Sequence, residues 1–115
     1  MGKRDLNILS RISECCDQIN AAMVFFGADL QTFEKNRIYQ DACAMNVLQI
    51  GEMAGRLSAE FREKCRDVPW QDIKGMRNVF AHEYEYVDLQ VLWQTMTEDI
   101  PELKKFCVKL LEEQI

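Results

Sequence analysis

The chain has 115 residues, 48% of them hydrophobic and 29% charged, which is typical of an ordinary globular protein with one domain, residues 1–115. The formal net charge of −5 argues against a protein that coats nucleic acid non-specifically, because such binding depends on neutralising phosphates. No apolar stretch approaches the roughly 20 residues of a membrane span, and the start of the chain does not resemble a signal peptide, so a cytoplasmic location without membrane contact is expected.

The first expected helix covers about residues 5–26. Apolar side chains recur there every three or four positions, at Leu6, Leu9, Ile12, Cys16, Ile19, Met23 and Phe26. This spacing places them on one face of an amphipathic helix. Gly27 is expected to end the helix, because glycine is favoured just beyond a helix C-terminus.

A second helix is expected over about residues 32–57, with Thr32 as a possible N-cap. Two stripes mark it, one at Val47, Ile50 and Ala54, and another, largely apolar, at Phe33, Ile38, Ala42, Met45, Gln49, Glu52 and Gly55. A helix that is apolar on two sides is typical of the centre of a bundle. Glu52 is open to two interpretations. It is a surface or helix-pairing residue, or it orients an arginine or imidazole of the next helix.

The remaining elements are also expected to be helical. Ser58 is a candidate cap for a short helix over residues 59–65, and a third helix begins near Trp70. Asp88 is a good N-cap for a last helix whose core stripe reaches Leu110, and Pro101 should kink this helix or divide it. No segment alternates for long enough to predict a strand. The expected fold is an all-α, up-and-down bundle of four to five helices.

Cysteine usage argues against a metal centre. The five cysteines form no CxxC pair, and the chain has one histidine, whereas zinc needs about four close Cys or His ligands. An odd number of scattered cysteines is typical of buried free thiols. No metal and no cofactor are expected.

The chemistry is concentrated around the single histidine, His82, which follows Arg77 by five residues and precedes Tyr84 by two. On an uninterrupted helix, Arg77 and His82 would lie about 140° apart. Either the helix ends near position 81 and the chain turns back, or a second copy of the protein completes the site. Asn78 lies four residues before His82 and could fix the imidazole tautomer on a continuing helix.

These residue types suit the cleavage of RNA. An imidazole can move the protons of the 2'-hydroxyl and the leaving oxygen, and a guanidinium can stabilise the negatively charged phosphorane. One histidine cannot act as base and acid at once, so this chemistry favours a homodimer. The structural alternative is that Arg77 and His82 only complement a helix dipole.

Positive charge collects just before this motif. Residues 56–77 contain six basic and four acidic side chains, a net charge of +2 in an acidic chain. The run is either a solvated face or a source of positive potential beside His82.

The sequence resembles the HepT-like branch of the HEPN superfamily over nearly its whole length. The resemblance rests on the run from Ile50 to Ala54, on Val68-Pro69-Trp70, on Ile73-Lys74-Gly75-Met76-Arg77-Asn78, and on the R-x-x-x-x-H-x-Y pattern ending at Tyr84. It implies a homodimeric, metal-independent endoribonuclease toxin of a toxin–antitoxin module, with a minimal nucleotidyltransferase of the MntA type as partner.

The same resemblance implies residue roles. Arg77 and His82 would be the catalytic pair at the dimer interface, and Asn78 and Glu52 would support them. Tyr84 would be AMPylated by the partner, which would block RNA by occupancy and charge repulsion; the alternatives are a structural phenol or the neighbouring Tyr86. Two other functions compete: a non-catalytic binding partner of a nucleotidyltransferase, and a purely structural helical dimer.

Overall fold

The computed structural model describes residues 2–76 and 88–114, and every regular element in these ranges is helical. The expected all-α class is therefore confirmed. The elements are α1 (Lys3–Phe26), α2 (Leu30–Glu34), α3 (Arg37–Ala54), α4 (Ala59–Lys64), α5 (Trp70–Lys74), α6 (Leu89–Gln94), the π-helical turn η2 (Thr95–Asp99) and α7 (Ile100–Glu112). No helix in these two ranges is long and apolar enough to cross a membrane.

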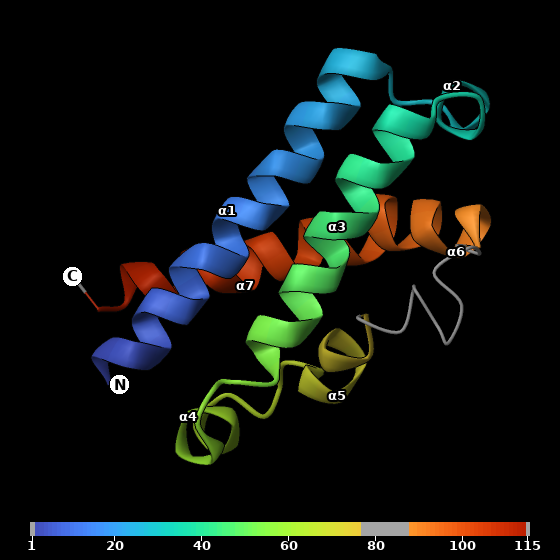
Figure 1. The fold of residues 1–115 in the computed structure, drawn as a ribbon. Coiled ribbons are helices and arrows are strands. Elements are labelled where there is room, and N and C mark those ends of the chain that lie inside the picture. The colour runs from blue at the N-terminus through green and yellow to red at the C-terminus, as the bar shows by residue number, and fades with distance from the viewer. Residues whose placement is uncertain (1, 77–87, 115) are drawn as a thin grey trace.

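The helices do not form the expected up-and-down bundle. Helices α1 and α3 run antiparallel and side by side, whereas the segment from α6 through α7 crosses behind them (Figure 1). The short helices α4 and α5 lie at the C-terminal end of α3, and α2 lies at its N-terminal end. These helices have only five or six residues, too few to run the length of a bundle. The short helices α2, α4 and α5 instead lie at the two ends of α3.

The first predicted helix is confirmed as α1. Its stripe is largely buried against α3 and α7, with Leu9, Ile12, Cys16 and Ile19 among the core residues. Gly27 ends the helix at φ 122°, a backbone conformation that side chains other than glycine rarely adopt.

The prediction of one helix over residues 32–57 is wrong, because the chain forms two. Asp29, not Thr32, caps α2: its carboxylate accepts hydrogen bonds from the Thr32 backbone N–H at 2.9 Å and the Thr32 hydroxyl at 2.8 Å. Asn36 starts α3 by accepting a hydrogen bond from the Tyr39 backbone N–H at 3.0 Å. Two local side-chain caps therefore prevail over a continuous helix.

Helix α3 buries only one of its two apolar stripes. Val47, Ile50 and Ala54 belong to the core. On the other stripe Ile38 is 73% exposed, Met45 is 50% exposed and Glu52 is also exposed. The expectation that α3 occupies the centre of the bundle is therefore wrong for a single chain. One side of α3 is covered by nothing among the described residues.

The other predicted helix boundaries are confirmed where they are described. Ser58 caps α4 by accepting from the Phe61 N–H, and Asp88 caps α6 by accepting from the next helical N–H groups. The last helix is divided between α6 and α7 by η2, which ends two residues before Pro101. Proline lacks an N–H and its ring crowds the carbonyl four residues earlier, and the wider π-helical turn absorbs that mismatch.

Candidate functional site

The structure places one of the five predicted site residues. Glu52 lies in the last turn of α3. Arg77, Asn78, His82 and Tyr84 fall between positions 76 and 88 and so lie outside the described residues. Residues 77–87 are named here the motif segment. The site is therefore described through the elements that hold the two ends of this segment.

The chain enters the motif segment from a fixed helix, α5. The Trp70 indole N–H donates a hydrogen bond to the Cys65 carbonyl at 2.9 Å, and both Trp70 and Ile73 are buried. Met76, the last described residue before Arg77, is also buried in the core. Helix α5 packs on α3, so α3 carries the start of the motif.

The chain leaves the motif segment into α6, which begins at the Asp88 cap. Leu92 is fully buried, and Trp93 packs near the ring of Phe33 with centroids 5.2 Å apart. Both ends of the segment are thus attached to the same core cluster.

Glu52 is exposed near the junction of α3 and α5. One turn further along the chain, a Cβ atom placed at Gly55 would lie 3.6 Å from Cε of Lys74. The Lys74 side chain of α5 therefore extends over the end of α3, close to the turn that carries Glu52. Glu52 forms no ion pair with the described residues. Its exposure agrees with the surface interpretation, and its orienting role stays a prediction.

Two pockets of opposite charge flank α5. One, of about 510 Å³, is lined by Arg62 and Arg66 of the α4 region together with Gln71. The other, of about 320 Å³, contains the carboxylates of Asp72, Asp99 and Glu102. Burial raises the pKa of Asp99, and the neighbouring Glu98 and Asp72 carboxylates add to the rise. The sequence showed these basic residues only as part of a run and did not predict that they line a pocket.

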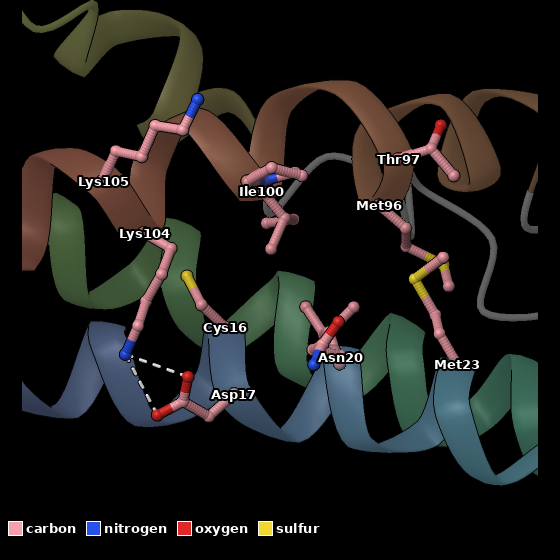
Figure 2. Close-up of a pocket in the computed structure, with 11 residues that line it drawn as sticks. Cys16, Asp17, Asn20, Met23, Met96, Thr97, Ile100, Lys104 and Lys105 are labelled. Carbon is pink, nitrogen blue, oxygen red and sulfur yellow. Dashed lines mark hydrogen bonds and ion pairs between the residues drawn. The ribbon is translucent and has the colours of Figure 1, made fainter. Parts of the chain in front are cut away.

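A third pocket, of about 530 Å³, lies between α1 and α7 (Figure 2). Met23, Met96 and Ile100 contribute apolar surface, and Lys104 lies at one end. The Lys104 ammonium is already paired, at 2.9 Å from the Asp17 carboxylate and 2.7 Å from the Ser13 hydroxyl. These contacts tie α7 to α1, so this lysine has a structural role.

The cysteines are confirmed as buried free thiols. Burial raises the pKa of Cys16, Cys43 and Cys107 to about 12. Because the thiolate is the reactive form, these side chains are poor nucleophiles and poor metal ligands at neutral pH. Within residues 2–76 and 88–114, no group of three or more His, Cys, Asp or Glu side chains could hold a metal ion.

The chain is similar to known ribonuclease sequences. A family model described as "Ribonuclease HepT-like" matches residues 8–110, a range that contains both the described core and the motif segment. A protein of Methanocaldococcus jannaschii named "Putative RNase" is 31% identical over 106 residues, which are 91% of this chain and 95% of that protein.

Two further relatives also carry ribonuclease names. A "Putative RNase" of Caldanaerobacter subterraneus is 36% identical over 88 residues, covering 76% of this chain and 79% of that protein. The "Probable ribonuclease HepT" of Thermococcus cleftensis is 40% identical over 55 residues, covering 48% of this chain and 50% of that protein. No solved structure matches the chain.

Proposed function

Because this chain belongs to the HepT-like ribonuclease family, we propose that it is a metal-independent endoribonuclease toxin with Arg77 and His82 as its catalytic pair. The observation that carries the proposal is the extent of the family match. It spans residues 8–110 and therefore includes the helices that hold the motif segment as well as the motif itself. We take residues 1–115 as a single domain of this family.

The proposed reaction is a transesterification within RNA. His82 of one copy accepts the proton of a ribose 2'-hydroxyl, and the 2'-oxygen forms a bond to phosphorus. The bond from phosphorus to the 5'-oxygen breaks, and the leaving oxygen takes a proton from a second imidazole. Arg77 stabilises the extra negative charge of the phosphorane. Asn78 and Glu52 support the pair by holding it in orientation.

The reaction needs a second imidazole, and the chain has one histidine, so we propose a homodimer. The uncovered side of α3 supports this assembly. Ile38, Met45 and Glu52 follow one another at seven-residue spacing along one exposed face of the helix. A second copy packed on this face, named here the α3 face, would cover these side chains and approach the end that carries Glu52.

We further propose that the toxin is controlled by a nucleotidyltransferase of the MntA type. The partner would AMPylate Tyr84, two residues from His82. An added nucleotide brings negative charge and bulk next to the catalytic pair, which repels and displaces an anionic substrate. Intact mass spectrometry after incubation with ATP and the partner should show added AMP on the wild type and none on Tyr84→Phe.

The chemistry is tested with two matched oligonucleotides, one of RNA and one with 2'-deoxyribose at every position. In EDTA, the wild type should cleave only the RNA and leave 2',3'-cyclic phosphate ends, because the 2'-oxygen is the nucleophile. Cleavage of both strands, or products that retain a 5'-phosphate, would contradict this route. Cleavage of neither, by protein whose mass shows no AMP, would favour the non-catalytic binding partner.

A further inference from the structure

The basic pocket beside α5 has the chemistry of a phosphate-binding site. Arg62 and Arg66 line it with the polar side chain of Gln71, over a floor that includes Val68 and Trp70. Guanidinium groups are always charged and present forked donors that match phosphate oxygens. Glu63 also lines the pocket, so the lining retains a net charge of +1. This local excess lies in a chain whose net charge is −5.

Both arginines are available to an incoming anion. Arg66 contacts Glu63 at 3.1 Å, but both side chains are largely exposed, and such surface pairs contribute only about 0–1 kcal/mol. Arg62 is half-buried and forms no ion pair with any described residue. The two other pockets offer no such pair of guanidinium groups. One is lined by lysines and by Asp17, which pairs with Lys104, and the other carries carboxylates.

The pocket floor indicates contact with the backbone of a nucleic acid rather than with its bases. Trp70 is only 7% exposed, and its indole N–H is fixed on the Cys65 carbonyl, so its ring offers no face for a base to stack on. Phosphate contacts position a strand without reading its sequence.

The pocket also lies on the segment that leads into the motif. Gln71 is in the first turn of α5. Met76 comes five residues after Gln71, just beyond the end of that helix. Five residues of helix correspond to about 8 Å along its axis. Arg77 is the next residue in the chain. A strand that contacts this pocket therefore lies within a few nucleotides of the start of the motif segment.

We propose that Arg62 and Arg66 form a phosphate-binding subsite that holds single-stranded RNA beside the Arg77–His82 motif, an inference that rests on the proposed ribonuclease function. The two arginines act as positioning residues and take no part in bond breaking. They supply electrostatic attraction that the acidic molecule as a whole does not, and they bind RNA without base preference.

The test measures binding separately from cleavage. The probe is a fluorescent single-stranded RNA carrying 2'-O-methyl groups, which cannot be cleaved by the 2'-hydroxyl route. Its affinity is followed by anisotropy from about 50 to 200 mM salt. For the variant Arg62→Ala/Arg66→Ala we expect a loss of about tenfold at low salt. The slope of log affinity against log salt should become less steep by about 1.4, or 0.7 for each lost phosphate contact.

The control is Lys105→Ala/Lys109→Ala on α7, which removes the same charge. Lys105 forms an exposed pair with Glu102 three residues away, just as Arg66 does with Glu63. The control should bind RNA as the wild type does, and Arg62→Lys/Arg66→Lys should keep the wild-type salt slope. Equal weakening in the control pair, or an unchanged slope in Arg62→Ala/Arg66→Ala, would overturn the subsite.

Cleavage distinguishes this inference from the function on which it rests. Arg62→Ala/Arg66→Ala should show a raised KM for single-stranded RNA long enough to reach the pocket, whereas Lys105→Ala/Lys109→Ala should keep the wild-type KM. If the wild type cleaves no RNA but its binding depends on the two arginines, the ribonuclease proposal fails and the binding site stands. If the wild type cleaves RNA and Arg62→Ala/Arg66→Ala keeps the wild-type KM for such RNA, the subsite fails alone.

Discussion

Asp5 is a buried carboxylate that joins the beginning of α1 to the beginning of α4. It is 7% exposed and accepts hydrogen bonds from the Ser58 backbone N–H at 2.9 Å and the Ser58 hydroxyl at 2.7 Å. The Ser58 hydroxyl in turn accepts from the Phe61 N–H. The sequence predicted the Ser58 cap because capping is local. It did not reveal Asp5, whose partner lies 53 residues away.

Replacing Asp5 by alanine should therefore destabilise the fold by about 1.5–3 kcal/mol, since it removes two hydrogen bonds to a buried, charged carboxylate. Urea unfolding followed by circular dichroism measures the change. Asp41→Ala, which removes an exposed pair with Arg37, should cost less than about 1 kcal/mol. If the Asp5 and Asp41 variants have equal unfolding free energies, the Asp5 contacts contribute no more to stability than an exposed ion pair.

The buried thiols make stability depend on alkaline pH. Burial raises the pKa of Cys16, Cys43 and Cys107 from 9.0 to about 12, so the folded protein holds protons that the unfolded chain releases. The stabilisation is full below pH 9 and is lost as the pH rises towards 12. The urea midpoint should fall over that range, and less steeply in Cys43→Ala. A midpoint that does not change with alkaline pH would contradict this account.

At the scale of elements, the sequence predicted those helices whose apolar periodicity and N-caps lie within the helix itself. It missed the division of the expected helix over residues 32–57, which depends on two separate N-caps. Phe33 and Ile38, on either side of residues 35 and 36, are five residues apart, or about 140° on a continuous helix, so the expected stripe is already irregular where α2 and α3 divide. The side chains of Asp29 and Asn36 decide it. The division near Pro101 was expected, because proline breaks or kinks a helix when it stands in the interior and is tolerated in the first turn, where Pro101 lies in α7.

The Asn36 cap should accordingly matter for α3. Asn36→Ala removes the hydrogen bond to the Tyr39 N–H and should cost about 1 kcal/mol of unfolding free energy. Asn36→Asp keeps a side-chain oxygen at that position and should restore most of the loss. Chemical denaturation of the three proteins in parallel measures both changes. An alanine variant as stable as the wild type would mean that α3 starts without this cap.

At the scale of the whole molecule, the α3 face explains why one sequence prediction was wrong. The stripe through Ile38 and Met45 was expected to be buried, and in a single chain it is exposed. An apolar pattern indicates that a surface is to be covered, but it does not say whether the same chain or another copy covers it. The proposed homodimer reconciles the pattern with the fold.

The homodimer makes a direct prediction. Ile38→Glu/Met45→Glu should convert a dimer into monomers of 13.5 kDa, because a dimer would bury the new charges. Val108→Glu, at an exposed apolar position on α7, should remain dimeric. Light scattering after gel filtration distinguishes the two masses. A monomeric wild type, or an Ile38/Met45 variant that remains dimeric, would contradict the assignment of the α3 face.

The candidate site was predictable from the sequence only as a set of residue types. The single histidine and the arginine five residues before it suit chemistry on RNA, because an imidazole can move protons and a guanidinium can stabilise the phosphorane. The basic pocket could not be assembled from the sequence alone. Arg62 and Gln71 come together through the packing between α4 and α5, which no periodicity encodes.

The most direct test of the central claim is cleavage of a purified RNA in EDTA by the wild type and by His82→Ala, prepared identically and shown by circular dichroism to be folded. The wild type should cleave, and the variant should lose activity by a factor of about 10² or more, the usual contribution of a general acid–base group. Equal cleavage by both proteins would contradict the assignment of His82. Absence of cleavage by wild type whose mass shows no AMP on Tyr84 would contradict the ribonuclease itself.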